Sequence, residues 1–165
     1  MPLTPLHWSV LLLGLLAFET VYLPALLVSS VLMDVEPAYY LFIAPNADGQ
    51  LHGFFHTVLG ATLMALAVAG LLARMRKPID RIAGSLGLGQ PKIGTAGIFA
   101  SSVVAAWSHI ILDATMHADM KPFWPVLDAN PLLGAVPIGT TYLITGIGVI
   151  AVMVLTIQRI RMPSG

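Results

Sequence analysis

The sequence contains no cysteine among its 165 residues. This absence excludes disulfide bonds, thiolate-bound metals, iron–sulfur clusters and cysteine nucleophiles. Any metal site in this chain must therefore be built from histidine and carboxylate side chains.

Charge is also scarce. Only 10% of the residues are charged, against roughly 25% in an ordinary soluble domain. The eight basic and eight acidic residues cancel, so the chain lacks the basic surplus that a nucleic-acid partner would require. With 57% hydrophobic residues and a mean hydropathy of +0.86, too little polar surface remains for a water-soluble globule. The composition predicts a membrane protein.

Four apolar stretches approach or exceed the roughly 20 residues that a helix needs to cross a hydrocarbon core about 30 Å thick. They run over Trp8–Leu32, Leu51–Arg74, Thr95–Met116 and Gly139–Ile157. We predict an all-α fold, an integral membrane bundle of four transmembrane helices forming a single transmembrane domain over residues 1–165. Because the first stretch has no basic leader and carries Glu19 inside it, we expect it to be a retained span and not a cleaved signal peptide.

The basic residues predict the orientation of these spans. All but Lys121 fall between the second and third spans or after the fourth, and this distribution places both termini in the cytoplasm. The connection over 75–94 contains four glycines and is expected to be a flexible cytoplasmic loop. On the other side, Met33–Gln50 is expected to lie at the membrane interface. Ala118–Pro137 contains four prolines, so it cannot be helical and predicts a proline-rich outer cap loop.

Four of the five histidines occur in two patches with a spacing of four residues. The patches are Asp48-x₃-His52-x₃-His56 at the start of the second span and His109-x₃-Asp113-x₃-His117 near the end of the third. Residues four apart lie on one face of a helix, so each patch predicts a row of ligand side chains.

The two rows are expected to meet, because the second and third spans run antiparallel. This arrangement pairs Asp48 with His117, His52 with Asp113, and His56 with His109. Successive pairs are separated by about 6 Å along the helices, whereas a metal–ligand bond is only about 2.0 to 2.2 Å long. The six side chains therefore have room for one or two ions.

Glu19 is expected at a depth similar to that of His109, and an intramembrane carboxylate generally faces the bundle interior and marks a functional site. Simpler interpretations remain open for every member of the two rows. Asp48 can be a helix N-cap, and His52 or His117 can be an interfacial residue in contact with water. The remaining three, His56, His109 and Asp113, can form a buried polar cluster that ties helices together. His7 is expected at the interface and is given no function.

The same two segments carry a resemblance to a known family. The string His52-Gly-Phe-Phe-His56-Thr resembles the H-R-G-x-T-H-S element of small integral-membrane proteins described as metal-dependent hydrolases, a group that includes a LexA-binding inner-membrane hydrolase. Ser108-His109-Ile-Ile-Leu-Asp113, with the proline-rich segment after it, is similar to that family's S-H-x-x-L-D element. By position, the resemblance implies a metal-binding core of His52, His56, His109 and Asp113.

These observations lead to a functional hypothesis. We expect a membrane-embedded, metal-dependent hydrolase that acts on an amphiphilic substrate, such as a phosphoester or lipid headgroup, at the outer leaflet. The ligand set of His52, His56, His109, Asp113 and His117 favours Zn²⁺, with Mn²⁺ or Fe²⁺ as alternatives. Glu19 or Asp48 would take a proton from water, and Lys121 would hold an anionic group. The expected partners are membrane lipid and the amphiphilic substrate.

Two alternatives from other classes stay open at this point. One is a protein that binds or conducts metal ions or protons without hydrolysis. The other is a structural subunit of a membrane complex.

Overall fold

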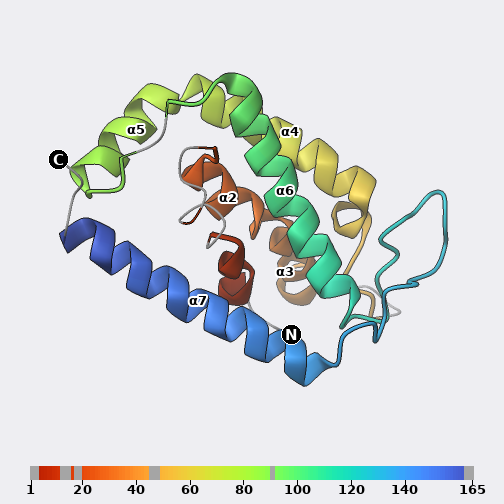
Figure 1. Ribbon diagram of the computed structural model, residues 1–165. Coiled ribbons are helices and arrows are strands. Elements are labelled where there is room, and N and C mark those ends of the chain that lie inside the picture. The colour runs from red at the N-terminus through yellow and green to blue at the C-terminus, as the bar shows by residue number, and fades with distance from the viewer. Residues whose placement is uncertain (1–3, 12–15, 17–19, 45–48, 90–91, 162–165) are drawn as a thin grey trace.

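The computed structural model describes residues 4–11, 16, 20–44, 49–89 and 92–161, and this part of the chain contains helices and no β-strand (Figure 1). Its α-helices are α2 (Leu23–Ser29), α3 (Val35–Phe42), α4 (Val58–Arg74), α5 (Arg76–Ser85), α6 (Thr95–Ala114) and α7 (Ile138–Arg161). Three 3₁₀ helices accompany them: η1 (Thr4–Val10), η2 (Leu32–Asp34) and η3 (Phe54–His56).

The first predicted span is wrong in its position. The apolar helical stretch runs over Leu23–Phe42, through α2, η2 and α3, and not over Trp8–Leu32. Pro24 explains the shift, because it occupies the first turn of α2, where a proline costs no hydrogen bond, and so it begins a helix instead of interrupting one. As a consequence Asp34 and Glu36, which the sequence pattern placed in an outer loop, lie within this apolar stretch.

The other spans agree better with the prediction. Thr95–Ala114 and Ile138–Gln158 are each long and apolar enough to cross a membrane. The pair α4 and α5 passes the same test together, although the two helices are bent by 76° at Met75. The described residues thus contain three candidate spans, or four if the bent pair counts as one. This architecture is that of a multi-pass membrane protein.

The connection after α4 is also corrected, because its residues Arg76–Ser85 form α5 and not a flexible loop. Within α5 the Arg76 guanidinium Nε donates to Asp80 Oδ2 over 3.1 Å, an ion pair at helical spacing. The hydroxyl of Tyr22, just before α2, donates to the other oxygen of Asp80 over 2.8 Å. These contacts fix α5 across the end of the bundle.

The proline-rich segment 118–137 contains no helix, as its prolines predict. Met120 and Pro122 are nevertheless buried, and the Pro122 carbonyl accepts a hydrogen bond of 2.8 Å from the amide of Val58. The amide of Asn130 donates to the carbonyls of Ala114 and His117 at the end of α6, over 2.8 and 3.0 Å. The segment is therefore tied to the start of α4 and the end of α6.

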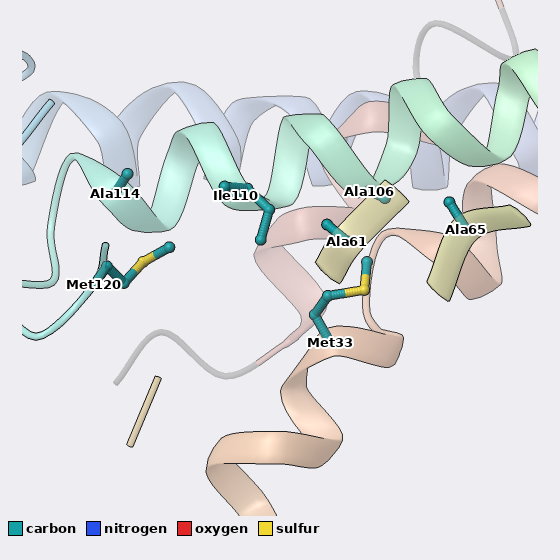
Figure 2. Close-up of a cluster of buried hydrophobic side chains, with 7 residues drawn as sticks. All are labelled: Met33, Ala61, Ala65, Ala106, Ile110, Ala114 and Met120. Atoms are coloured by element: carbon teal, nitrogen blue, oxygen red, sulfur yellow. The ribbon is translucent and has the colours of Figure 1, made fainter. Parts of the chain in front are cut away.

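The main packing contact is between α4 and α6, which lie side by side in Figure 1. Figure 2 shows the small side chains at this interface: Ala61 and Ala65 of α4 with Ala106 and Ala114 of α6. Small residues let two membrane helices approach closely, so their backbones and the side chains at their ends are held in a fixed relation. Met33 closes the same cluster from η2.

Helix α7 packs mainly on η1. At Gly148 an added Cβ would lie 2.7 Å from the Cβ of Ser9, so glycine allows the two segments to touch. The rest of α7 carries exposed aliphatic side chains such as Leu143, Ile147 and Ile150, each about 60% exposed. In a multi-pass membrane protein such a surface faces lipid.

Candidate metal centre

Helix α6 supplies the regular half of the site. His109 and Asp113 lie one turn apart on its buried face, and the distance from His109 Nε2 to Asp113 Oδ2 is 3.3 Å. This is the arrangement that the spacing of four residues predicts. The third member of the expected row, His117, lies beyond the last residue of the helix, Ala114, and so departs from the helical row.

The segment before α4 is not part of an α-helix, which corrects the expected row on the second span. Residues 49–53 are irregular, His56 ends the 3₁₀ helix η3, and α4 begins only at Val58. Thr57 causes this late start, because its extended backbone and its Oγ1, which accepts a hydrogen bond of 2.9 Å from the amide of Gly60, make it the N-cap. Gly60 also lets the preceding turn sit close, since an added Cβ would lie 2.0 Å from the carbonyl oxygen of Phe54.

Despite the irregular backbone, His56 reaches His109. Their Nε2 atoms are 3.3 Å apart, so the expected pairing of these two residues is present. The expected pairing of His52 with Asp113 is not: the ring of His52 lies against that of His117, with centroids 4.4 Å apart, and its Nδ1 contacts Asp119 at 2.9 Å.

Four side chains converge at the His56–His109 contact, and we call them the central cluster: Asp34, His56, His109 and Asp113. From His109 Nε2 the distance to Asp34 Oδ1 is 3.6 Å, and from His56 Nε2 to Asp113 Oδ2 it is 4.0 Å. His56, His109 and Asp113 are buried, and the side chain of Asp34 is 22% exposed.

Contacts at Nδ1 fix the orientation of the His56 and His109 rings, on the side of each ring away from the other histidine. Nδ1 of His56 lies 2.9 Å from the Glu36 carboxylate, and Nδ1 of His109 lies 2.7 Å from the carbonyl oxygen of Ser30. Both partners are acceptors, so each Nδ1 carries a proton, and in the neutral form of either ring Nε2 is the nitrogen left free to bind a metal ion. With both rings neutral, two Nε2 lone pairs and the Asp113 carboxylate would face one another in a buried place, and a metal ion between them would remove this repulsion.

The spacing of these atoms suits a metal ion. A tetrahedral ion with ligand bonds of about 2.0 to 2.1 Å has ligand atoms about 3.3 to 3.4 Å apart. The observed separations that involve His109 Nε2 are 3.3, 3.3 and 3.6 Å. The residues present therefore fit a divalent ion, with carboxylate and carbonyl groups behind the histidines as in known metal sites.

Gly53 and Glu36 show how the segment before α4 is locked to α3. Glu36 accepts hydrogen bonds from the amides of Gly53 and Phe55, over 3.0 and 3.2 Å, besides its contact with His56. A Cβ at position 53 would lie 2.7 Å from Glu36 Oε1, so only glycine lets the carboxylate approach this closely. One carboxylate thus fixes both the backbone around His56 and the orientation of its ring.

His7 belongs to the site, although the sequence pattern gave it no function. Its ring stacks on that of His109, with centroids 3.9 Å apart, and its Nε2 lies 3.2 Å from Asp113 Oδ1. It is 2% exposed. His7 thus restrains both residues that α6 contributes.

A second group lies beside the central cluster, and we call it the rim cluster: His52, His117 and Asp119. Asp119 accepts hydrogen bonds from the amides of Leu51 and His52 as well as facing the His52 ring. Burial alone would raise the pKa of the Asp119 carboxyl, but these hydrogen bonds outweigh it and hold the pKa below its ordinary value. Burial and the neighbouring His52 lower the pKa of His117, so its ring favours the neutral form that binds metal.

Lys121 lies near the rim cluster, where it lines a cavity of about 300 Å³ together with His52 and Trp124. Its ammonium group is paired with Asp128 at 2.6 Å, and both side chains are exposed. The other two residues predicted to act in catalysis, Glu19 and Asp48, lie outside the described residues.

Sequence reasoning missed four members of this region: His7, Asp34, Glu36 and Asp119. A signal for Asp34 and Glu36 did exist, because both follow an apolar run that begins at Pro24, a residue that favours a helix start. His7 and Asp119 gave no comparable signal, since neither lies at helical spacing from another candidate ligand.

The fold and the site together define a class: an all-helical, multi-pass membrane protein with histidine and aspartate groups that could hold a metal ion. The sequence model of the family described as YdjM inner membrane protein matches residues 5–164, and the chain belongs to this family. Searches of curated proteins and of solved structures find no match.

Proposed function

We propose that this inner-membrane protein binds a divalent metal ion in the central cluster and uses it to hydrolyse an ester or phosphoester of a membrane amphiphile. The observation that carries the proposal is the meeting of the two Nε2 atoms of His56 and His109 with the Asp113 carboxylate, all within 4.0 Å and buried. Nitrogen and carboxylate ligands without sulfur favour Zn²⁺, with Mn²⁺ or Fe²⁺ as alternatives. The rim cluster offers three ligands for a second ion.

The side chains of the site have two tasks: to hold the metal ion and to accept a proton from water. When bound, the ion would lower the pKa of a water molecule and polarise the substrate oxygen. His56, His109 and Asp113 hold it, and Glu36 and Ser30 keep the two rings turned inward. Asp34, whose side chain is the most exposed of the central cluster, is placed either to complete the ligand set or to accept the proton. The same role stays a prediction for Glu19 and Asp48.

The substrate class follows from the surroundings of the site. The cavity beside His52 combines the rings of Phe54 and Trp124 with the ammonium of Lys121, a mixture that suits the boundary between an acyl chain and an anionic headgroup. The surface pair between Lys121 and Asp128 is exposed and therefore weak, so an anionic substrate can displace Asp128.

The orientation completes the proposal. The basic residues of α5 and the end of α7 favour the cytoplasmic side for that end of the bundle, which puts the rim cluster and the cavity beside His52 at the outer leaflet. Reporter fusions at Lys92 and Asp128 should then report opposite compartments, with Lys92 on the cytoplasmic side. The reverse assignment would move the site to the inner leaflet.

A second function has one observation in its favour. Four protein ligands would fill a tetrahedral ion completely, as in structural zinc sites, whereas catalytic sites keep a position open. A protein that stores or passes ions without hydrolysis, or a structural subunit of a membrane complex, would use such a closed site. Hydrolysis requires that Asp34 leave the ion or that a fifth position open.

The experiment that separates these functions measures metal content and turnover on the same preparations. Purified protein in lipid is given a panel of phosphoesters and acyl esters, before and after chelation and after addition of Zn²⁺ or Mn²⁺. The proposal expects metal-dependent turnover, lost on the order of 10²-fold or more in Asp113→Asn. Asp34→Asn should keep the ion and lose turnover if Asp34 is the base, but lose both if it is a ligand. Bound metal without turnover on any substrate would favour the second function.

A further inference from the structure

A second cavity lies at the other end of the bundle, away from the rim cluster. It has a volume of about 430 Å³ and lies between α2, α5 and α7. Its lining includes Leu23 and Leu27 from α2, Ile79, Ile82 and Ala83 from α5, and Val152 from α7. Among the described lining residues only Thr156 brings a hydroxyl group. The volume is within the usual range for ligand pockets, and the described lining offers a polar ligand only this one hydroxyl, so it suits an apolar occupant.

The cavity follows α2 into the depth of the membrane. The backbone amide of Tyr22, just before α2, donates to Ser101 Oγ over 3.0 Å, and Ser101 lies about 9 Å along α6 from its first residue. Leu27 lies one turn before Ser30, whose carbonyl contacts His109. The cavity thus extends from the level of α5 to about one turn from the central cluster.

Helix α5 gives the cavity its membrane-surface end. One face of α5 lines the cavity, with Ile79, Ile82 and Ala83, and Leu86 continues this face just after the helix. Lys77 and Arg81 lie on the opposite face and are exposed. The bend of 76° from α4 turns α5 across the end of the bundle, where Figure 1 shows it approaching the end of α7. An amphipathic helix placed in this way lies in the plane of the membrane surface.

The basic side chains around α5 favour an anionic lipid as the ligand of this cavity. Residues 74–89 contain four basic side chains and one acid, Asp80, which is already bonded to Arg76 and Tyr22. Basic side chains at a membrane surface attract anionic lipid headgroups. The exposed apolar side chains of Ile82 and Leu86 lie beside the cavity, so an acyl chain can enter from the bilayer without crossing water.

We propose that this cavity binds one acyl chain of an anionic phospholipid whose headgroup lies at the basic face of α5. The chain would fill the apolar space along α2, and Lys77 and Arg81 would hold the headgroup. This site is separate from the proposed hydrolytic centre and does not depend on that function. The bound lipid would stabilise the packing of α5 against α2 and α7.

The first test counts the lipids that the purified protein retains. The protein is reconstituted in vesicles of phosphatidylcholine with a minor fraction of phosphatidylglycerol, extracted in mild detergent and analysed by native mass spectrometry. We expect one phosphatidylglycerol to be retained in preference to phosphatidylcholine. The substitutions Lys77→Gln and Arg81→Gln should each lower that preference about fivefold, the effect of one cation at a membrane surface. Equal retention of the two lipids by the wild type would overturn the proposal.

A matched pair of variants tests the cavity itself. Ala83→Trp fills the cavity, whereas Gly84→Trp adds the same side chain at the next position, where an added Cβ meets nothing within 4 Å. Only Ala83→Trp should lose most of the retained lipid, and both should keep the wild-type metal content if the fold is intact. Equal retention by the two variants would contradict the proposal.

A measurement on the unsubstituted protein covers the case in which Ala83→Trp fails to fold. Phosphatidylglycerol with a photoreactive acyl chain is incorporated, and the cross-linked residues are mapped. We expect cross-links at Leu27, Ile79 and Val152 in excess of those at Ile147 and Ile150, which are exposed on α7. An even distribution over both sets would mean that the lipid only covers the outside of the bundle.

Discussion

The central and rim clusters contain the same residue types but differ in how they are held. In the central cluster, helix α6, α3 and the carbonyl of Ser30 restrain the two histidines from separate directions, and three of its four members are buried. The rim cluster draws on irregular segments on either side of the bundle, and only His52 is fully buried in it. A pre-oriented, water-poor ligand set binds an ion more tightly than an exposed one. We therefore expect the central cluster to be filled first.

The largest effect is expected from His109→Ala. This change removes the nitrogen that contacts the other three members of the central cluster, so purified protein should lose most of its metal. Ser108→Ala is the matched control, because within the described residues its hydroxyl donates to the carbonyl of Ala105 in the same helix and contacts no member of the central cluster. Metal content after dialysis against a weak chelator is the measurement. If wild type and His109→Ala keep equal trace amounts, the cluster is a polar packing contact and not a metal site.

A smaller effect is expected from Glu36→Gln, which leaves every central ligand in place. The amide can still accept the proton of His56 Nδ1 but removes the negative charge behind the ring. Loss of such a partner typically costs about 10- to 100-fold in metal affinity. Competition with a fluorescent chelator measures this change. Asp128→Asn, which removes a carboxylate from the surface, should leave the affinity unchanged, and an equal loss in both variants would show a nonspecific charge effect.

The comparison between clusters is tested directly by His117→Ala. If each cluster holds an ion, the variant should keep the central ion and lose the rim ion, so metal content falls from about two to about one per chain. If only the central cluster is filled, content stays near one. Loss of all metal in His117→Ala would reverse the proposed order of the two clusters.

The same contrast explains how much the sequence could predict. The contact of His109 with Asp113 followed from spacing alone, because α6 is a continuous helix and its period fixes which residues align. The pairing of His56 with His109 also followed, since it required only that two neighbouring elements run antiparallel.

Other residues of the site lie on irregular backbone, so helical spacing could not predict their contacts. The spacing of Asp48, His52 and His56 fits an α-helix equally well, but the N-cap at Thr57 and the hydrogen bonds that Glu36 accepts from the backbone keep this segment out of α4. Asp34 and Glu36 fall just after the first predicted span, which ends at Leu32, and the helix start at Pro24 instead places them inside an apolar stretch. The long-range contacts of His7 and Asp119 carry no local pattern at all.

The smallest effect is expected at the edge of the site, from Lys121→Gln. Lys121 is 49% exposed and its pair with Asp128 is screened by water, so an interaction with an anionic substrate is worth at most about 1 kcal/mol there. One kcal/mol corresponds to about a fivefold rise in KM, with kcat and metal content unchanged, because the ammonium group contacts the cavity and not the central cluster. Lys121→Arg keeps the charge and should keep KM near the wild-type value. A fall in kcat with unchanged KM would instead place Lys121 at the reacting atoms, and the rim would then be part of the catalytic centre and not its entrance.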